Sequence, residues 1–214
     1  MNRVFSKMFL WMFLGLMVTF GVAYFLSQND TMMYNLFSGK KYMIVWIAEI
    51  VVVLVLSLRI HKLSLMSARI LFILYSLLTG LTVSTIFIVY SFSSIIYVFF
   101  ITSILFLIFG LIGYFTKIDL SRFGTILAMA LLGGIICTII NIFIKSETFD
   151  LATTLFMIVV FLGYIAYDIN KVKNNFRNIE DEDKLAIYGA LELYLDFINL
   201  FLRLLRLLGN SRDN

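Results

Sequence analysis

The sequence contains no proline, one cysteine and one histidine among its 214 residues. Without proline, a kink in a helix must come from glycine, serine, or an inserted side chain or water. The single cysteine, Cys137, excludes a disulfide within the chain. Because Cys137 lies in an apolar run, we expect a buried and inert thiol. One histidine and one cysteine cannot build a His/Cys zinc site.

Charged residues are also scarce, at 14% of the chain, whereas hydrophobic residues make up 62%. Soluble domains have about 25% charged and about 45–50% apolar residues. The composition therefore predicts a polytopic membrane protein embedded in a lipid bilayer. The net charge of +4 gives no reason to expect a nucleic-acid partner. The chain has no Gly-rich phosphate loop, HExxH motif or nucleophile elbow, so we expect neither enzymatic activity nor a cofactor.

Apolar runs long enough to cross a bilayer occur seven times, since a membrane helix needs about 20 mostly apolar residues. The predicted spans are residues 8–27, 42–59, 68–90, 95–115, 123–144, 151–170 and 185–208. The first follows a basic start, as a signal peptide would, but it is too long and no A-x-A-like site follows. We expect an all-α fold in one domain, residues 1–214. The odd number of spans argues against a transporter built from two inverted repeats.

Basic residues are spread unevenly over the loops, which predicts the orientation in the membrane. If successive spans cross the membrane in opposite directions, one side carries eleven basic residues: Arg3, Lys7, Arg59, Lys62, Arg69, Lys117, Arg122, Lys171, Lys173, Arg177 and Lys184. The loops of the other side carry three: Lys40, Lys41 and Lys145. Cytoplasmic loops hold the excess of Lys and Arg, so we expect a cytoplasmic N-terminus. Seven crossings then place the C-terminus outside, together with the basic residues Arg203, Arg206 and Arg212.

Four acidic residues stand within the apolar spans: Glu49, Asp168, Glu192 and Asp196. A carboxylate at mid-membrane depth costs roughly 3 kcal/mol, and such residues usually face the bundle interior and mark an ion or proton path. Plainer interpretations stay open. Glu49 could bond a neighbouring helix, and Asp168 could be solvated near the end of its span. The acidic residues 180–183 precede the last span, where the helix dipole favours negative charge, so they predict a solvated helix start.

The last span carries a polar stripe. Its members follow steps of four, four, three, four and three: Tyr188, Glu192, Asp196, Asn199, Arg203 and Arg206. Residues three and four apart share one face of a helix. A polar stripe along most of a membrane helix is expected to face the bundle interior or a water-filled cavity. The alternative is an amphipathic helix lying flat on the membrane, which the wide apolar arc disfavours.

Several segments resemble a known family. ALELYLDFINLFLRLLRLLG, residues 190–209, closely resembles the last transmembrane segment of the Bax inhibitor family, and GYIAYDINKVK, residues 163–173, resembles its sixth segment. A looser match runs through the Asn141 region, TGLTVSTIF in the third span and the first span. The likeness therefore covers nearly the whole chain.

The resemblance implies a seven-helix fold in which the last helix is central and the other six surround it. It also implies a pH-sensitive calcium leak, with calcium moving passively across the membrane. We expect the protein to be a monomer in a bacterial cytoplasmic membrane. In this family two aspartates on helices six and seven form a proton-sensing pair, and these match Asp168 and Asp196. The family's arginine at the end of helix two, which engages the pair, matches Arg59.

The remaining polar residues are assigned to the ion pathway. Asn199 and Arg206 fit the family pattern, whereas Glu192 and Arg203 depart from it. Glu49 joins the pathway, and carboxylate oxygens of Glu49 and Asp196 are predicted to bind calcium transiently, because calcium prefers oxygen ligands.

Three other functions stay open. The same acids could carry protons in a proton-coupled transporter or exchanger. They could instead specify helix packing in a membrane interaction protein without transport. An intramembrane aspartyl protease would need YD and GxGD motifs, and only Tyr167-Asp168 is present.

Overall fold

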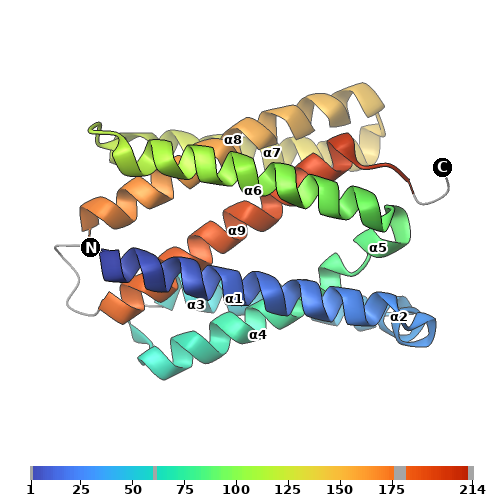
Figure 1. Cartoon of the computed structure of the whole chain (residues 1–214). Coiled ribbons are helices and arrows are strands. Elements are labelled where there is room, and N and C mark those ends of the chain that lie inside the picture. The colour runs from blue at the N-terminus through green and yellow to red at the C-terminus, as the bar shows by residue number, and fades with distance from the viewer. Residues whose placement is uncertain (1, 60–61, 176–181, 212–214) are drawn as a thin grey trace. The chain divides into compact units, whose positions relative to one another are not determined.

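The protein is all-α, as predicted, in a computed structural model that describes residues 2–59, 62–175 and 182–211 (Figure 1). Its helices are α1 (Asn2–Ser27), α2 (Asp30–Phe37), α3 (Lys41–Arg59), α4 (Leu65–Val83), α5 (Ile86–Val89), α6 (Phe92–Phe115), the short 3₁₀ helix η2 (Leu120–Phe123), α7 (Gly124–Ile144), α8 (Glu147–Asn175) and α9 (Glu182–Leu208). Within these described ranges the structure contains no β-strand.

Within the described residues, seven stretches of helix are long and apolar enough to cross a membrane, and they correspond to the seven predicted spans. Their surfaces carry many exposed large apolar side chains, such as Phe143 (81% exposed) and Leu58 (76% exposed), which a bilayer would cover. Among these seven stretches the largest buried share, 67%, belongs to α9.

Some details differ from the prediction. The loop after the first span contains the short helix α2, whose first turn is capped by Asn29. Cys137 is half-buried rather than buried. Glu182 and Asp183 lie in the first turn of α9, which confirms an acidic helix start. Residues 180 and 181, and the loop residues Arg177 and Arg212, lie outside the described residues.

The chain divides into two compact units. Unit 1 comprises residues 1–92, 179–194 and 211–214, and unit 2 comprises residues 93–178 and 195–210. The first half of α9 thus belongs to unit 1 and its second half to unit 2.

In unit 1, α4 packs against α1 and α3. A Cβ atom on Gly15 of α1 would lie 2.9 Å from the ring of Phe72, so the absence of a side chain lets α1 and α4 approach closely. Trp11 meets the edge of the Phe72 ring, and Phe72 in turn meets Tyr194 of α9 edge-on. Both Phe72 and Tyr194 are fully buried, so aromatic packing forms the core of this unit.

The third span is interrupted between α4 and α5 without a proline. Ser84 donates to the Leu81 carbonyl (2.6 Å), and Thr85 donates to the Thr82 carbonyl (3.0 Å). Such bonds from Ser and Thr compete with the helix's own hydrogen bonds and bend helices. These two bonds therefore explain how the helix is interrupted here in a chain that contains no proline.

In unit 2, α7 packs against α8, and the loop between α6 and η2 is tied to the end of α8. Asn170, which is 1% exposed, donates to the carbonyls of Gly113 and Ile118 and accepts from the Leu120 amide. Lys173 donates to the carbonyls of Tyr114 and Thr116. These bonds satisfy carbonyls at the end of α6, where the helix cannot satisfy them itself.

Candidate functional site

Asp168 lies on α8 in unit 2, and its residue is 5% exposed. The Lys171 ammonium is 4.0 Å from its Oδ1 atom, one turn along the same helix. α8 extends to Asn175, so Asp168 lies about 10 Å before the end of the helix at 1.5 Å per residue. The interpretation of Asp168 as a solvated residue at a helix end is therefore wrong, because α8 is longer than its apolar run.

Asp196 lies on the part of α9 that belongs to unit 2, and it is also 5% exposed. The hydroxyl of Tyr164 lies within electrostatic range of both Asp168 and Asp196. Tyr164 precedes Asp168 by one turn of α8, so both side chains occupy one face of that helix. The structure thus places both predicted sensor carboxylates within electrostatic reach of one half-buried phenol. Sequence reasoning missed Tyr164, although its spacing of four residues from Asp168 was a usable signal.

Glu49 lies on α3 in unit 1 and is half-buried. Its Oε1 atom accepts a hydrogen bond from the Thr79 hydroxyl of α4 at 2.8 Å. The phenol of Tyr75 on α4 lies within electrostatic range of Glu49. The open interpretation that Glu49 bonds a neighbouring helix is therefore correct, and its part in a pathway stays a prediction.

A second polar group lies in the core of unit 1. The Tyr194 hydroxyl is 2.6 Å from Thr19 Oγ1, and Thr19 donates its own proton to the Ser76 carbonyl at 2.9 Å. A threonine hydroxyl has one proton, so Tyr194 must be the donor to Thr19. These three residues therefore join α9, α1 and α4 through a directed chain of hydrogen bonds. No pattern in the sequence distinguished them from ordinary core residues.

The predicted stripe on α9 is only partly buried. All six of its residues are described, and Asp196 is the buried one. Asn199 donates to the Leu195 carbonyl of its own helix at 2.8 Å. Glu192 and Arg203 are half-buried, and Arg206 is exposed. The stripe therefore runs from a buried position at Asp196 to an exposed one at Arg206.

Arg59 is the last residue of α3, in unit 1, and its side chain is exposed. Its predicted engagement with the aspartate pair of unit 2 stays a prediction.

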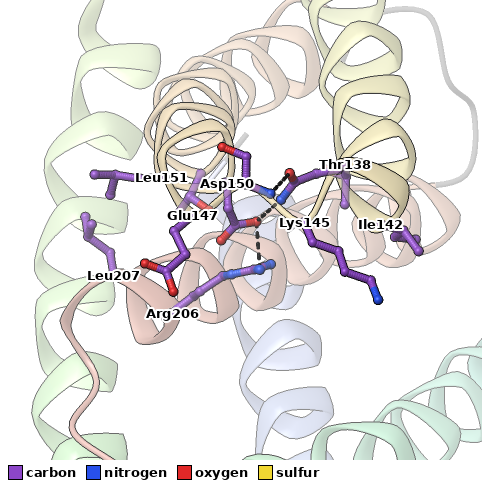
Figure 2. Close-up of a pocket in the computed structure, with 11 residues that line it drawn as sticks. Thr138, Ile142, Lys145, Glu147, Asp150, Leu151, Arg206 and Leu207 are labelled. Carbon is purple, nitrogen blue, oxygen red and sulfur yellow. Dashed lines mark hydrogen bonds and ion pairs between the residues drawn. The ribbon is translucent and has the colours of Figure 1, made fainter.

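Unit 2 also contains a cavity of about 450 Å³ where α7 ends, α8 begins and α9 ends (Figure 2). Asp150 of α8 is at its centre: Oδ1 accepts from Arg206 Nη2 at 2.7 Å and from Asn141 Nδ2 at 3.3 Å. Its lining residues are Thr138, Asn141, Ile142, Lys145, Ser146, Glu147, Asp150, Leu151, Thr154, Arg206 and Leu207. Arg206 of the predicted stripe thus lines a cavity, whereas the other five residues of the stripe are not among its lining residues.

The cavity and the aspartates lie at different depths along the same helices. Asp150 and Asp168 are about 27 Å apart along α8, and Asp196 and Arg206 are about 15 Å apart along α9, by helical rise. Sequence reasoning missed Asp150 and Glu147. The available signal was the charged break IKSETFD between two apolar spans.

Comparison with known proteins matches residues 1–213 to the family model described as inhibitor of apoptosis-promoting Bax1. The chain is 45% identical over 213 residues to the inner membrane protein YbhL of Escherichia coli (strain K12), covering 97% of this chain and 91% of YbhL. It is 39% identical to the uncharacterized protein RP147 of Rickettsia prowazekii, covering 100% of this chain and 92% of that protein. It is 36% identical to an uncharacterized protein of Borreliella burgdorferi, covering 100% and 94%. With residues 1–213 matched and seven helices of membrane-spanning length among the described residues, the chain belongs to the Bax inhibitor family of membrane proteins.

Proposed function

We propose that the protein is a pH-sensitive calcium leak, which lets Ca²⁺ cross the membrane passively and is gated by protonation of Asp168 and Asp196. The observation that carries this proposal is the burial of both carboxylates, each within electrostatic reach of the half-buried Tyr164. Membership of the Bax inhibitor family supports it. The loop charges support a cytoplasmic N-terminus. The likeness to an inner membrane protein of Escherichia coli supports a location in a bacterial cytoplasmic membrane.

The physical basis is the repulsion between two buried carboxylates. Two negative charges in a low-dielectric site repel strongly, so the pair binds one proton between its members. Lys171, at 4.0 Å from Asp168, offsets one of the negative charges. Proton uptake or loss then changes the attraction between α8 and the second half of α9, which acts as the switch.

Calcium itself requires oxygen ligands. In the proposed path, Glu49 and Asp196 bind it transiently, and Glu192, Asn199, Arg203 and Arg206 line the route. Thr79 holds the Glu49 carboxylate in position through its 2.8 Å hydrogen bond. Arg59 is proposed to engage the aspartate pair in one of the two states.

The proposal is tested by calcium entry into dye-loaded liposomes that contain the purified protein, from about pH 6 to about pH 8, where a perturbed carboxylate pair can titrate. The variants are Asp168→Asn and Asp196→Asn. The matched control is Asp30→Asn, which makes the same chemical change at an exposed position of α2. We expect pH-dependent flux in the wild type and the control, and pH-independent flux in both sensor variants.

Absence of flux above that of empty liposomes at every pH would refute the leak. A proton-coupled transporter would instead move protons in fixed proportion to calcium, which a pH-sensitive dye inside the liposomes detects. If Asp196→Asn changed only thermal stability and left flux unaltered, the charges would serve helix packing.

A further inference from the structure

The cavity of unit 2 has features of a ligand site, and Arg206 is the lining residue that the proposed calcium route shares with it. Its volume, about 450 Å³, is within the usual range of roughly 300–1,000 Å³ for small-molecule sites. Its lining combines two acidic side chains, Glu147 and Asp150, with two basic ones, Lys145 and Arg206. The charges of the lining therefore balance, which suits a ligand that carries one charge of each sign.

A buried hydroxyl in this lining has no hydrogen-bond partner among the residues that the structure describes. Thr154 is 2% exposed, and its Oγ1 atom forms no hydrogen bond within the described part of the chain. A buried hydroxyl without a partner costs free energy, so an unfilled hydrogen bond at the wall of a cavity points to a ligand or water there. By contrast, the Thr138 hydroxyl in the same lining donates to the Gly134 carbonyl at 2.8 Å.

The charged groups also retain unused hydrogen-bonding capacity. Arg206 uses Nη2 for Asp150, whereas a guanidinium has five N–H donors. Lys145 and Glu147 are exposed. Lys145 has a left-handed backbone (φ 55°) and lies at the turn between α7 and α8, directly before Ser146 and Glu147. The turn therefore places an ammonium and a carboxylate at the same rim.

We propose that this cavity binds a phosphoethanolamine group, supplied by the head of a phosphatidylethanolamine in the surrounding bilayer. Arg206 and Lys145 donate to the phosphate, since Arg and Lys are the usual phosphate-binding side chains. Glu147 and Asp150 accept from the primary ammonium. The Thr154 hydroxyl forms its missing hydrogen bond with the phosphate or with a water that the head group holds.

The lining selects against other head groups. A choline head has no N–H to donate to the two carboxylates, and its recognition relies on aromatic cages. Among the described residues that line the cavity, none is aromatic. A phosphatidylglycerol head would leave both carboxylates facing an anion without an ammonium. Of these three head groups, phosphoethanolamine offers both a phosphate for the basic side chains and an ammonium with N–H donors for the carboxylates.

The place of the cavity favours a lipid as the source. It lies at the ends of three membrane-length helices, and its apolar lining residues are Ile142, Leu151 and Leu207. Ile142 is 64% exposed and the adjacent Phe143 is 81% exposed, so an apolar surface continues from the cavity onto the face of α7. Acyl chains of a bound lipid can lie along that surface.

The test is native mass spectrometry of the purified full chain with dioleoyl phosphatidylethanolamine, phosphatidylcholine and phosphatidylglycerol, each added separately. The variants are Glu147→Gln and Lys145→Asn, because asparagine tolerates the left-handed backbone of residue 145. The matched controls are Glu182→Gln and Lys40→Asn at exposed positions outside the cavity. We expect preference for phosphatidylethanolamine, and a loss of about tenfold in its affinity in each cavity variant, the value of one charge-assisted hydrogen bond.

Equal affinity for the three lipids, or unchanged affinity in both cavity variants, would overturn the proposal. Competition by soluble glycerophosphoethanolamine would support the head group as the part recognised. If the soluble ester bound and the lipid did not, a membrane lipid as the source would be refuted. These measurements record binding and not flux, so their outcome is independent of the proposed leak.

Discussion

The Tyr194 hydroxyl of α9 donates to the hydroxyl of Thr19 in α1, over 2.6 Å, inside the core of unit 1. The Thr19 hydroxyl in turn donates a hydrogen bond to the Ser76 carbonyl of α4, so one chain of hydrogen bonds joins three membrane helices. Uncharged hydroxyl groups can thus hold a charged helix such as α9 in a defined position without exposing a charge to lipid.

Replacing Tyr194 by phenylalanine should lower the free energy of unfolding by about 0.5–1.5 kcal/mol, because the ring still fills the core and one hydrogen bond between helices is lost. Unfolding in mixed detergent micelles measures this change. Tyr97→Phe is the control, since Tyr97 is 62% exposed. Equal stability of the two variants would contradict the role of the Tyr194 hydroxyl.

Two glycines of unit 2 give opposite predictions. A Cβ on Gly113 would collide with the backbone of Ala166, lying 2.8 Å from its Cα, and backbone atoms cannot move aside cheaply. Gly113→Ala should therefore lower the free energy of unfolding by roughly 1–3 kcal/mol. Gly133 has nothing within 4 Å of such a Cβ, so Gly133→Ala should be neutral or stabilise by up to about 1 kcal/mol. Thermal unfolding of both variants tests the pair, and equal losses would show that α6 and α8 are not this close.

The ion pair between Asp150 and Arg206 should contribute little to stability. The Arg206 side chain is 49% exposed, and water screens exposed pairs. In a double-mutant cycle with Asp150→Asn and Arg206→Gln, we expect a coupling energy below about 1 kcal/mol. A coupling of several kcal/mol would mean that the pair is desolvated in the membrane-embedded protein.

Asp119 precedes η2 and should respond to pH. Its Oδ1 atom accepts from the Ser121 amide at 3.0 Å, and this bond, aided by Asn174, lowers the pKa of the Asp119 carboxyl. A carboxyl whose pKa is lowered by folding stabilises the folded loop above its ordinary pKa and loses that effect as pH falls through the lowered one.

Titration of the carboxyl carbon by NMR should place the Asp119 midpoint below the usual aspartate range. Asn174→Ala should raise the midpoint only slightly, since the bond to the Ser121 amide is the larger cause. A midpoint at the ordinary value would show that the cap does not form.

Much of the fold follows from local sequence. Seven apolar runs predicted seven spans, because burial of a helix in lipid depends on the length and composition of one continuous segment. The end of the sixth span was less predictable, because α8 continues through polar residues to Asn175. Two of these polar side chains, Asn170 and Lys173, donate hydrogen bonds to backbone carbonyls of the loop of residues 116–120. Asp168 is therefore well inside a helix, which an apolar run alone could not indicate.

The sequence by itself determined the class of protein, the spans and the positions of the costly carboxylates, since each depends on neighbours along the chain. Only the tertiary structure decided which residues meet. It gathered Asp168, Asp196 and Tyr164, and it joined Asn141, Asp150 and Arg206 around a cavity. Each of these groups includes residues from more than one helix, and an uncharged Tyr, Thr or Asn in an apolar run looks the same whether it faces lipid or a carboxylate. The rotation and packing of each helix, which depend on the whole core, make that distinction.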